Sequence, residues 1–182
     1  MRVATLGLTA AAALALTPSV ATAPPALVEV VPIVVSHPTG PPDRAHGFVA
    51  GNGLVVTVAH VLGGRVTVGG RRASVARVDR RLDLAVLRVP GVRGERPRLA
   101  ENADATTVLG RPGPVVRRIA ARVDGGPARP ALELRADVSP GDSGAPLVTS
   151  TGRVAGVVFA RSSSRPSTAY AVDASAVAQM LR

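Results

Sequence analysis

The stretch "GFVAGNGLVVTVAHV", residues 47–61, sets the fold class. Two apolar runs flank Gly51-Asn52-Gly53, and an Asn-Gly pair between such runs is a strong signal for a β-hairpin. Most apolar residues in these runs are valine, whose branched side chain favours a strand over a helix. The segment therefore predicts two antiparallel strands.

Short apolar runs and turn signals continue on both sides of this hairpin. Residues 27–36 read as a strand interrupted by Pro32, and residues 65–78 read as a hairpin that turns at Gly69-Gly70. "LDLAVLRVP", residues 82–90, reads as the last strand of this half. The first half of the chain is thus expected to be antiparallel β-structure throughout.

The second half repeats this pattern after a polar, irregular section around residues 91–104, which is the expected internal boundary. Only at the C-terminal end does the spacing of apolar residues change from that of a strand to that of a helix. In "DASAVAQMLR", Asp173 can cap a helix whose Val177, Ala178 and Leu181 fall on one face.

We therefore expect an all-β fold: two packed six-stranded antiparallel β-barrels with a C-terminal helix. The expected units are a signal peptide at 1–21, a linker at 22–25, an N-terminal barrel at 26–105, and a C-terminal barrel with the terminal helix at 106–182.

The composition excludes several classes of protein. The 182 residues include no cysteine, so disulfides, thiolate catalysis and cysteine-based zinc sites are ruled out. The three histidines have no metal-ligand spacing, and we expect neither a metal nor another cofactor. The net charge of +10 comes from scattered arginines, and only three residues are aromatic, which argues against a nucleic-acid partner.

The N-terminus, "MRVATLGLTAAAALALTPSVA", has the pattern of an export signal. Arg2 gives a positive start, Leu6 to Leu16 form an apolar stretch, and Ser19-x-Ala21 offers the small residues that a signal peptidase recognises. The apolar stretch is too short to cross a bilayer of about 30 Å as a helix. We expect cleavage after Ala21 and a secreted or cell-envelope protein, with an uncleaved anchor or a buried N-terminal helix as the alternatives.

"PGDSGAPL", residues 140–147, displays Ser143 between small and turn-forming residues. Such a segment is either an ordinary turn or a loop that presents a nucleophile. A nucleophilic serine needs a base and an acid that orients the base. His60, at the end of an apolar run, and Asp83, at the start of another, are candidates, although each alone also fits a structural role.

The segments "TVAHV", "DLAVL" and "PGDSGAPL" occur in this order, and each resembles the matching motif of the trypsin-like serine proteases. The order histidine, aspartate, serine distinguishes this family from others that reach the same geometry. The resemblance extends from about residue 26 to the end. It is greatest to the HtrA-like bacterial branch, close to the MarP-like envelope proteases of actinobacteria. It implies a secreted serine endopeptidase that acts on polypeptides.

The resemblance also assigns roles within the site. His60 is the implied general base, Asp83 the residue that orients it, and Ser143 the nucleophile. The backbone N–H groups of Gly141 and Ser143 are the implied oxyanion hole. Ala145 stands where the family usually has a second glycine, so local packing there is expected to differ.

Substrate binding is implied for the strand "VVFAR", residues 157–161, with Phe159, Ala160 and Arg161 along an edge that pairs with an extended peptide. Asp137 lies six residues before Ser143, where trypsin has the acid that selects arginine and lysine.

Two features nevertheless oppose a basic specificity. Arg135 could neutralise Asp137, and the side chains of Arg161 and Thr168 stand near positions that are glycine in trypsin. We expect a preference for small or medium apolar residues before the cleaved bond.

Asp142 raises the question of activation. In digestive trypsin-like enzymes the equivalent aspartate pairs with a newly freed isoleucine amine. No isoleucine-valine-glycine-glycine start precedes "HGFVAGNG" here. We expect Asp142 to pair with local backbone N–H groups or an arginine.

Two alternatives compete with the endopeptidase. One is a catalytically silent protease-fold protein with a binding or regulatory role in the cell envelope. The other is a basic adhesion protein that binds anionic cell wall or nucleic acid through its arginines. The multi-helix membrane region and the peptide-binding domain of related proteases have no counterpart in this sequence. We therefore expect no stable membrane span after signal cleavage, and the oligomeric state stays open.

Overall fold

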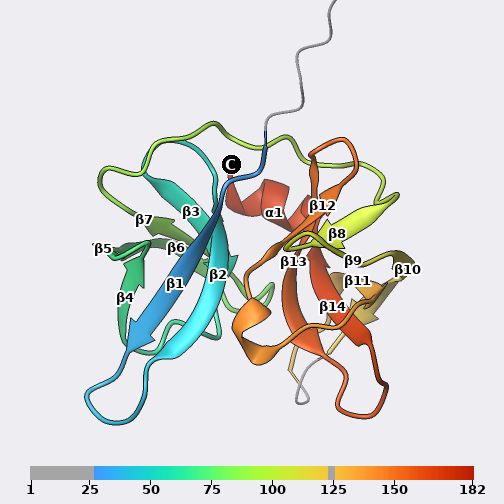
Figure 1. The fold of residues 1–182 in the computed structure, drawn as a ribbon, viewed down its shortest axis with the longest axis horizontal. Coiled ribbons are helices and arrows are strands. Elements are labelled where there is room, and N and C mark those ends of the chain that lie inside the picture. Colours follow the sequence, from blue (N-terminus) through green and yellow to red (C-terminus); the bar gives the residue numbers. More distant parts are fainter. Residues whose placement is uncertain (1–26, 123–125) are drawn as a thin grey trace, which may run out of the picture.

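The structure, a computed structural model, describes residues 27–122 and 126–182. The predicted signal peptide (1–21) and linker (22–25) lie outside the described residues. The described chain is mostly β-structure, and its strands form two antiparallel sheets of seven strands each (Figure 1).

The first sheet has the strand order β5-β4-β1-β2-β3-β7-β6. Its strands are β1 (Val30–Ser36), β2 (Asp43–Val49), β3 (Leu54–Val58), β4 (Arg65–Val68), β5 (Arg71–Arg72), β6 (Ser74–Asp79) and β7 (Leu84–Arg88).

The second sheet has the strand order β10-β11-β14-β13-β12-β8-β9. Its strands are β8 (Thr106–Val108), β9 (Arg111–Pro112), β10 (Val115–Ala121), β11 (Arg129–Arg135), β12 (Pro146–Thr149), β13 (Val154–Arg161) and β14 (Thr168–Asp173). A short 3₁₀ helix, η1 (Pro140–Asp142), precedes β12, and the chain ends in the helix α1 (Ala174–Met180).

The expected all-β fold of two packed barrels with a C-terminal helix is confirmed, and each sheet has one strand more than expected. The additional strands, β5 and β9, are only two residues long. The turn at Gly69-Gly70 forms as predicted, with φ of +53° and +78°, angles that glycine adopts readily. Its hairpin is short because the chain then leaves β4 and pairs with β7 as β6.

The expected interruption of the first strand at Pro32 is wrong. β1 runs through this residue, and Pro32 is paired with His46 of β2. On its other side, pairing with β4 begins only at Ile33. Proline lacks an N–H group, and here it stands where β4 does not reach, so the ladder to β4 loses no hydrogen bond.

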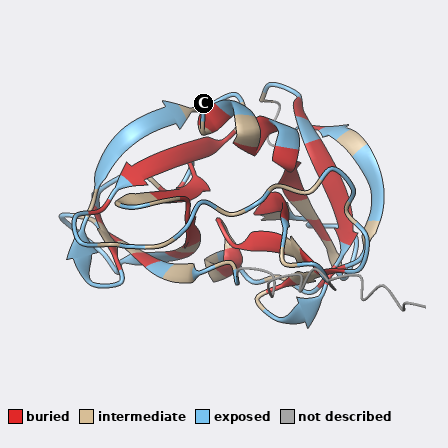
Figure 2. Ribbon diagram, turned by 90° about the horizontal axis from the view of Figure 1, so that it is seen from above, coloured by how far each residue is buried: buried red, intermediate tan, exposed pale blue. Residues whose placement is uncertain are grey.

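The core is built from small aliphatic side chains, as the low aromatic content requires. Figure 2 shows the buried residues on the inner faces of both curved sheets. One cluster fills the first barrel and extends across the interface to Val157, Val172 and Val177, and a second cluster fills the inside of the second barrel. The two barrels therefore share apolar packing, and this fixes the interface in which the candidate site lies.

The terminal helix α1 contacts β13 and β14 of the second sheet and β7 of the first. Its expected cap is confirmed, since the Asp173 carboxylate accepts a hydrogen bond of 2.9 Å from the Ser175 N–H. Val177 is buried, and Leu181 packs against the shared core. Across residues 27–122 and 126–182, no helix has the length and apolar character needed to cross a membrane.

Candidate active site

Strand pairing in the first sheet brings His60 and Asp83 together. β3 and β7 are antiparallel neighbours, and Val58 is paired with Leu84. His60 lies two residues after the end of β3, and Asp83 lies immediately before β7 begins. Because antiparallel neighbours place the end of one strand beside the start of the other, both residues reach the same end of the sheet.

Asp83 holds His60 by two hydrogen bonds. The His60 Nδ1–H group donates to Asp83 Oδ2 at 2.8 Å, and the backbone N–H of His60 donates to Oδ1 at 2.9 Å. The Ala59 N–H also donates to the Asp83 carbonyl at 3.1 Å. Asp83 is 7% exposed, whereas the His60 side chain is 45% exposed, so the imidazole is fixed on one side and accessible on the other.

The backbone at Asp83 has an unusual conformation, with φ of +57°. Aspartate tolerates this left-handed region better than most residues other than glycine do. A residue held in such a conformation by its surroundings is often part of a functional site. Here the conformation presents both carboxylate oxygens to His60.

A third residue, Arg129, lies at the same carboxylate and was not found from the sequence. Its Nη1 atom is 3.2 Å from Asp83 Oδ2, and Arg129 is 7% exposed. The guanidinium carbon lies 5.1 Å from the centre of the Phe159 ring, a cation–π contact. Nothing in the sequence separates Arg129 from the other arginines, because its position follows only from how the two barrels pack.

Ser143 follows η1, and its loop is attached to β2 of the other barrel (Figure 1). The His46 backbone N–H donates to the Ser143 carbonyl at 2.8 Å, and the His46 Nδ1–H group donates to the Gly141 carbonyl at 2.8 Å. His46 therefore fixes the serine loop.

Gly144 allows the close approach between the serine loop and the first barrel. Its φ is +84°, and a Cβ atom there would lie 2.0 Å from the His46 carbonyl oxygen and 2.5 Å from Thr57 Oγ1. The Thr57 hydroxyl in turn donates to the His46 carbonyl at 2.7 Å. The serine loop therefore lies against His46 of β2 and Thr57 of β3, and Thr57 is three residues before His60.

Asp142 has the partners expected from the sequence. Its Oδ2 atom accepts a hydrogen bond of 2.8 Å from the Ser139 N–H and one of 2.6 Å from Arg111. Burial raises the pKa of this carboxyl, but the Ser139 N–H and the Arg111 guanidinium outweigh burial and hold the pKa of Asp142 below its usual value. Asp142 is thus a charged clamp within the serine loop.

Two features expected of a catalytic site are not formed among the described residues: the hydrogen bond between Ser143 and His60, and a free Ser143 N–H group in the oxyanion hole. Within the described ranges, no hydrogen bond joins Ser143 Oγ to His60, and the Ser143 N–H donates weakly to the Pro140 carbonyl at 3.5 Å. That distance is at the upper limit for a hydrogen bond, so a stronger acceptor can displace it. Gly141 and Ser143 as an oxyanion hole therefore stay a proposal.

The expected substrate strand has an uncovered edge. β12 pairs with β13 only as far as Val157, and beyond that point β13 has β14 on one side alone. Val158 is tied to the serine loop, accepting from the Gly144 N–H at 2.8 Å and donating to the Ala145 carbonyl at 2.9 Å. Of the predicted binding residues, Phe159 is buried, Ala160 is half-buried and Arg161 is exposed. Ala145 itself is buried in the core of the second barrel, which accommodates its methyl group.

Asp137 and Arg135, the acidic and the basic residue considered for substrate specificity, do not neutralise each other. Asp137 and Arg135 are both exposed, and the described residues show no ion pair between them. Arg161 ends β13 and Thr168 begins β14, and Arg161 is paired with Ala169.

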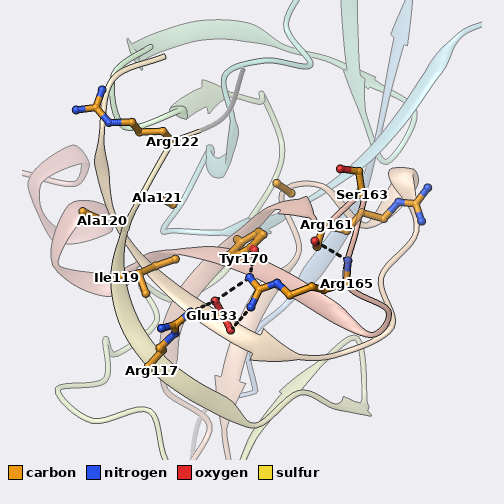
Figure 3. A pocket seen from close by; sticks show the side chains of 12 residues that line it. Arg117, Ile119, Ala120, Ala121, Arg122, Glu133, Arg161, Ser163, Arg165 and Tyr170 are labelled. Atoms are coloured by element: carbon orange, nitrogen blue, oxygen red, sulfur yellow. Dashed lines mark hydrogen bonds and ion pairs between the residues drawn. The ribbon is translucent and has the colours of Figure 1, made fainter. Parts of the chain in front are cut away.

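Beyond Arg161, a cavity of about 530 Å³ opens between β10, β11 and the β13–β14 hairpin (Figure 3). Arg117, Arg122, Arg161 and Arg165 line it, together with Tyr170 and a single carboxylate, Glu133. Arg165 contacts both Glu133 oxygens, at 3.0 and 3.1 Å, and Arg117 contacts one at 3.1 Å. The hydrogen bond from Arg165 is the main reason that the pKa of Glu133 lies below its ordinary value, despite burial. Four guanidinium groups against one ionised carboxylate leave this cavity positive.

The described residues contain no group of three or more histidine, aspartate or glutamate side chains suited to hold a metal ion.

This fold is also found in a known family of proteins. The model of the trypsin-like peptidase domain matches residues 45–157. The chain therefore belongs to the trypsin-like peptidase family, as the three sequence motifs predicted.

Among curated proteins, the chain is similar to the serine proteases Rv3671c and MT3772 of two Mycobacterium tuberculosis strains. Each is 35% identical over 162 residues, a match that covers 74% of this chain and 40% of the relative. The chain thus spans about two fifths of their length.

Among solved structures, the active form of the Rv3671c protease matches with a TM-score of 0.76 and 27% identity, covering 95% of this chain and 93% of that one. An inactive serine-to-alanine form matches with a TM-score of 0.69 and 29% identity, covering 84% and 85%.

Proposed function

We propose that this protein is a secreted serine endopeptidase with His60, Asp83 and Ser143 as its catalytic triad. The observation that carries the proposal is the pair of hydrogen bonds that His60 donates to the Asp83 carboxylate. The pair lies where β3 ends and β7 begins, and the serine loop is docked on β2 and β3.

The reaction is acyl transfer. His60 Nε2 accepts the proton of Ser143 Oγ as the oxygen attacks the peptide carbonyl, and then gives this proton to the leaving amine. Asp83, which accepts from His60 Nδ1–H, keeps Nε2 free to act as the base and stabilises the imidazolium that forms. Water then attacks the acyl-enzyme by the same route and releases the second product.

The developing oxyanion is stabilised by the N–H groups of Gly141 and Ser143. For this, the Ser143 N–H must leave the Pro140 carbonyl, to which it donates at 3.5 Å. One such donor is worth about 3 kcal/mol in the transition state. The carbonyl of Gly141 already points to His46, and this hydrogen bond holds the loop from the side away from the substrate.

Substitution of the nucleophile tests this proposal. Ser143→Ala is expected to lower turnover of a casein or peptide-library substrate by about a millionfold while the fold is kept. A fluorophosphonate should label wild-type protein at Ser143 and leave the variant unlabelled. A variant that cleaves at the wild-type rate would contradict the proposal.

The catalytically silent alternative makes the opposite prediction. A folded wild-type protein that is neither labelled by fluorophosphonate nor active on any peptide of a diverse library would favour the binding or regulatory role.

The proposed specificity is for small or medium apolar residues before the cleaved bond. Arg161 ends β13 and Thr168 begins β14, and these two residues flank the entrance of the pocket proposed for the residue before the cleaved bond. Asp137, the alternative selector of basic residues, is exposed, and an exposed carboxylate attracts a cation weakly. Cleavage of a peptide library mainly after arginine or lysine, lost in Asp137→Ala, would assign the selection to Asp137 instead.

Export is proposed from residues 1–21 alone. N-terminal sequencing of protein secreted by a host cell should begin at Thr22. Protein that keeps Met1 in the membrane fraction would instead indicate an anchor.

A further inference from the structure

Arg129 lies at the carboxylate that orients the proposed base, and no step of the mechanism above uses it. We propose that Arg129 is a positioning residue that fixes the Asp83 carboxylate and, through it, the imidazole of His60. This inference rests on the proposed triad.

Two N–H groups, one from His60 and one from Arg129, lie at the same carboxylate oxygen of Asp83. Asp83 Oδ2 accepts from His60 Nδ1–H at 2.8 Å and lies 3.2 Å from Arg129 Nη1. Oδ1 accepts from the His60 backbone at 2.9 Å. The carboxylate is therefore held from three directions, and rotation about its bond to Cβ would break contacts on both oxygens.

The second barrel holds the guanidinium in place. Arg129 begins β11, and its side chain stacks on Phe159 of β13. In the described residues, Asp83 is the one carboxylate that forms an ion pair with Arg129, and the buried Nε atom has no hydrogen-bond partner. Breaking a buried ion pair leaves an uncompensated charge and is strongly unfavourable. Each member of the pair thus compensates the buried charge of the other.

The chemical consequence is for His60. An ionised Asp83 stabilises the imidazolium, whereas a cation beside that carboxylate offsets part of the stabilisation. Arg129→Met removes this offset, so the imidazolium form of His60 should be more favoured in the variant than in the wild-type protein.

Other charged groups on neighbouring elements are left unchanged by a substitution at Arg129. They are Asp79, Arg80 and Arg81 in the turn before Asp83, and His46 and Asp142 with Arg111 at the serine loop. A change in the pKa of His60 can therefore be assigned to the removed guanidinium.

The direct test is a proton NMR titration of the histidines in the Ser143→Ala background, which needs no catalysis. Arg129→Met is expected to move the His60 titration to higher pH, because it removes a cation from the carboxylate that His60 contacts. Arg129→Lys, which keeps the charge, should restore most of the original value. His37 and His46 serve as internal references because the chain has three histidines. Arg118→Met is a matched control, since Arg118 pairs with a different buried aspartate, Asp173.

The kinetic test uses the active protein. In Arg129→Met the acid limb of the pH profile of kcat/KM should move upward by the same amount, with kcat reduced and KM little changed. A merely structural role would lower the melting temperature without moving this limb. A folded Arg129→Met protein with the wild-type His60 pKa would overturn the inference, whether or not the protein proves to be a protease.

If Arg129→Met does not fold, Phe159→Leu keeps the test open. It removes the ring beneath the guanidinium and retains an apolar side chain. A smaller upward shift of the His60 pKa supports the inference, and an unchanged value contradicts it.

The positive cavity of Figure 3 carries a second, independent inference. We propose that it binds acidic side chains of the substrate on the N-terminal side of the cleaved bond. This also rests on the proposed endopeptidase.

The cavity lies at the end of the uncovered edge of β13. The serine loop is bonded to Val158, and the uncovered edge runs from there to Arg161, which lines the cavity. A substrate strand antiparallel to β13 has its N-terminal residues toward Arg161. At about 3.4 Å per residue, the third and fourth residues before the cleaved bond reach the cavity.

The charges of the cavity indicate the chemical class of the side chain that it binds. Glu133 contacts Arg117 and Arg165 and holds their guanidinium groups in place. Among the described residues, Arg161 forms no ion pair, and the Arg122 guanidinium donates one hydrogen bond, to the Gly126 carbonyl at 3.3 Å. Such groups bind a carboxylate through charge-assisted hydrogen bonds.

Two fluorogenic peptides that differ only in glutamate or glutamine at these two positions test the inference. Wild-type kcat/KM should be about fivefold higher for the glutamate peptide at low salt, and the ratio should fall in 0.5 M salt, which screens charges. Arg161→Gln and Arg122→Gln should each lower the ratio. Arg153→Gln, beside a different hollow of the second barrel, is the control and should keep it.

Equal kcat/KM for the two peptides in wild type would overturn this inference and leave the endopeptidase intact. Binding of both peptides to the Ser143→Ala protein, followed by fluorescence anisotropy, covers a protein that does not cleave. Tighter binding of the glutamate peptide supports the acidic site, and equal affinity contradicts it.

Discussion

Gly144 is the residue on which the junction between the two barrels depends. Its backbone has a positive φ, and it lies against the carbonyl of His46 so closely that no Cβ atom fits. A glycine after the serine is thus required by contact with the other barrel as well as by the local turn.

Gly144→Ala is expected to destabilise the protein by about 3 kcal/mol or more, because backbone atoms must move apart as well as adopt a strained φ. Urea unfolding measures this change. Gly110→Ala is the matched control, since Gly110 has φ of +77° and open space around it, so it reports the strain of φ alone. Equal losses in the two variants would show that the close approach is unimportant.

Arg111 and Asp142 give the serine loop a dependence on pH. The folded-state pKa of Asp142 is lowered, so its contribution to stability is present above the unfolded-state value near 4. This contribution is lost as the pH falls through the lower folded-state pKa.

Arg111→Gln should therefore lower the free energy of unfolding at pH 7 by about 1 kcal/mol, a modest value because Arg111 is half-exposed. The difference from wild type should shrink as the pH falls below 4. Urea unfolding from pH 7 to pH 3 measures it. A difference that is constant over this range would exclude the Asp142 carboxylate as the cause.

At the scale of elements, α1 fastens the end of the chain across both barrels. Asp173 caps the helix and also pairs with Arg118 of β10. Helix α1 is only seven residues long, and an isolated helix of this length is not stable in water. Its stability comes from the cap and from packing on the shared core.

Asp173→Ala is expected to lower the free energy of unfolding by about 1 to 2 kcal/mol, since it removes a cap and the partner of Arg118. Ser175→Ala, on the exposed first turn of the same helix, should have little effect. Thermal unfolding of the three proteins decides the point, and equal melting temperatures would contradict the capping role.

At the scale of the whole molecule, Asp142 of the serine loop is held by residues of the folded chain itself. It is paired with Arg111 and Ser139, and we expect that no new N-terminal amine is needed to hold the loop. The first described strand, β1, is a central strand of its sheet rather than a free arm.

Protein that begins at residue 22 with an acetylated N-terminus should therefore have the same kcat/KM as protein with a free amine. The comparison is made after mass spectrometry confirms that neither form has been trimmed. Activity found only in a form cut within residues 26–46 would mean that activation requires proteolysis.

Much of the fold and part of the site could be predicted from local sequence. The hairpin turns at Gly51-Asn52-Gly53 and Gly69-Gly70, the cap at Asp173 and the local N–H partner of Asp142 depend on neighbours in the chain, and each was predicted. The arginine that pairs with Asp142 was predicted only as a residue type, because Arg111 lies 31 residues away. Pro32 was misread because its effect depends on where β4 stops, which is a property of the sheet. The serine, histidine and aspartate motifs were recognised because each is a short, local pattern.

The sequence by itself determined the fold class, the family and the three motifs, because strand period, turn chemistry and spacing are carried by adjacent residues. The tertiary structure alone decided that His46 holds the Gly141 carbonyl, that Gly144 has no room for a side chain, and that Arg129 reaches Asp83. Each of these contacts joins one barrel to the other across dozens of residues. Their geometry depends on how two apolar surfaces pack, and no periodicity or spacing within either segment encodes it.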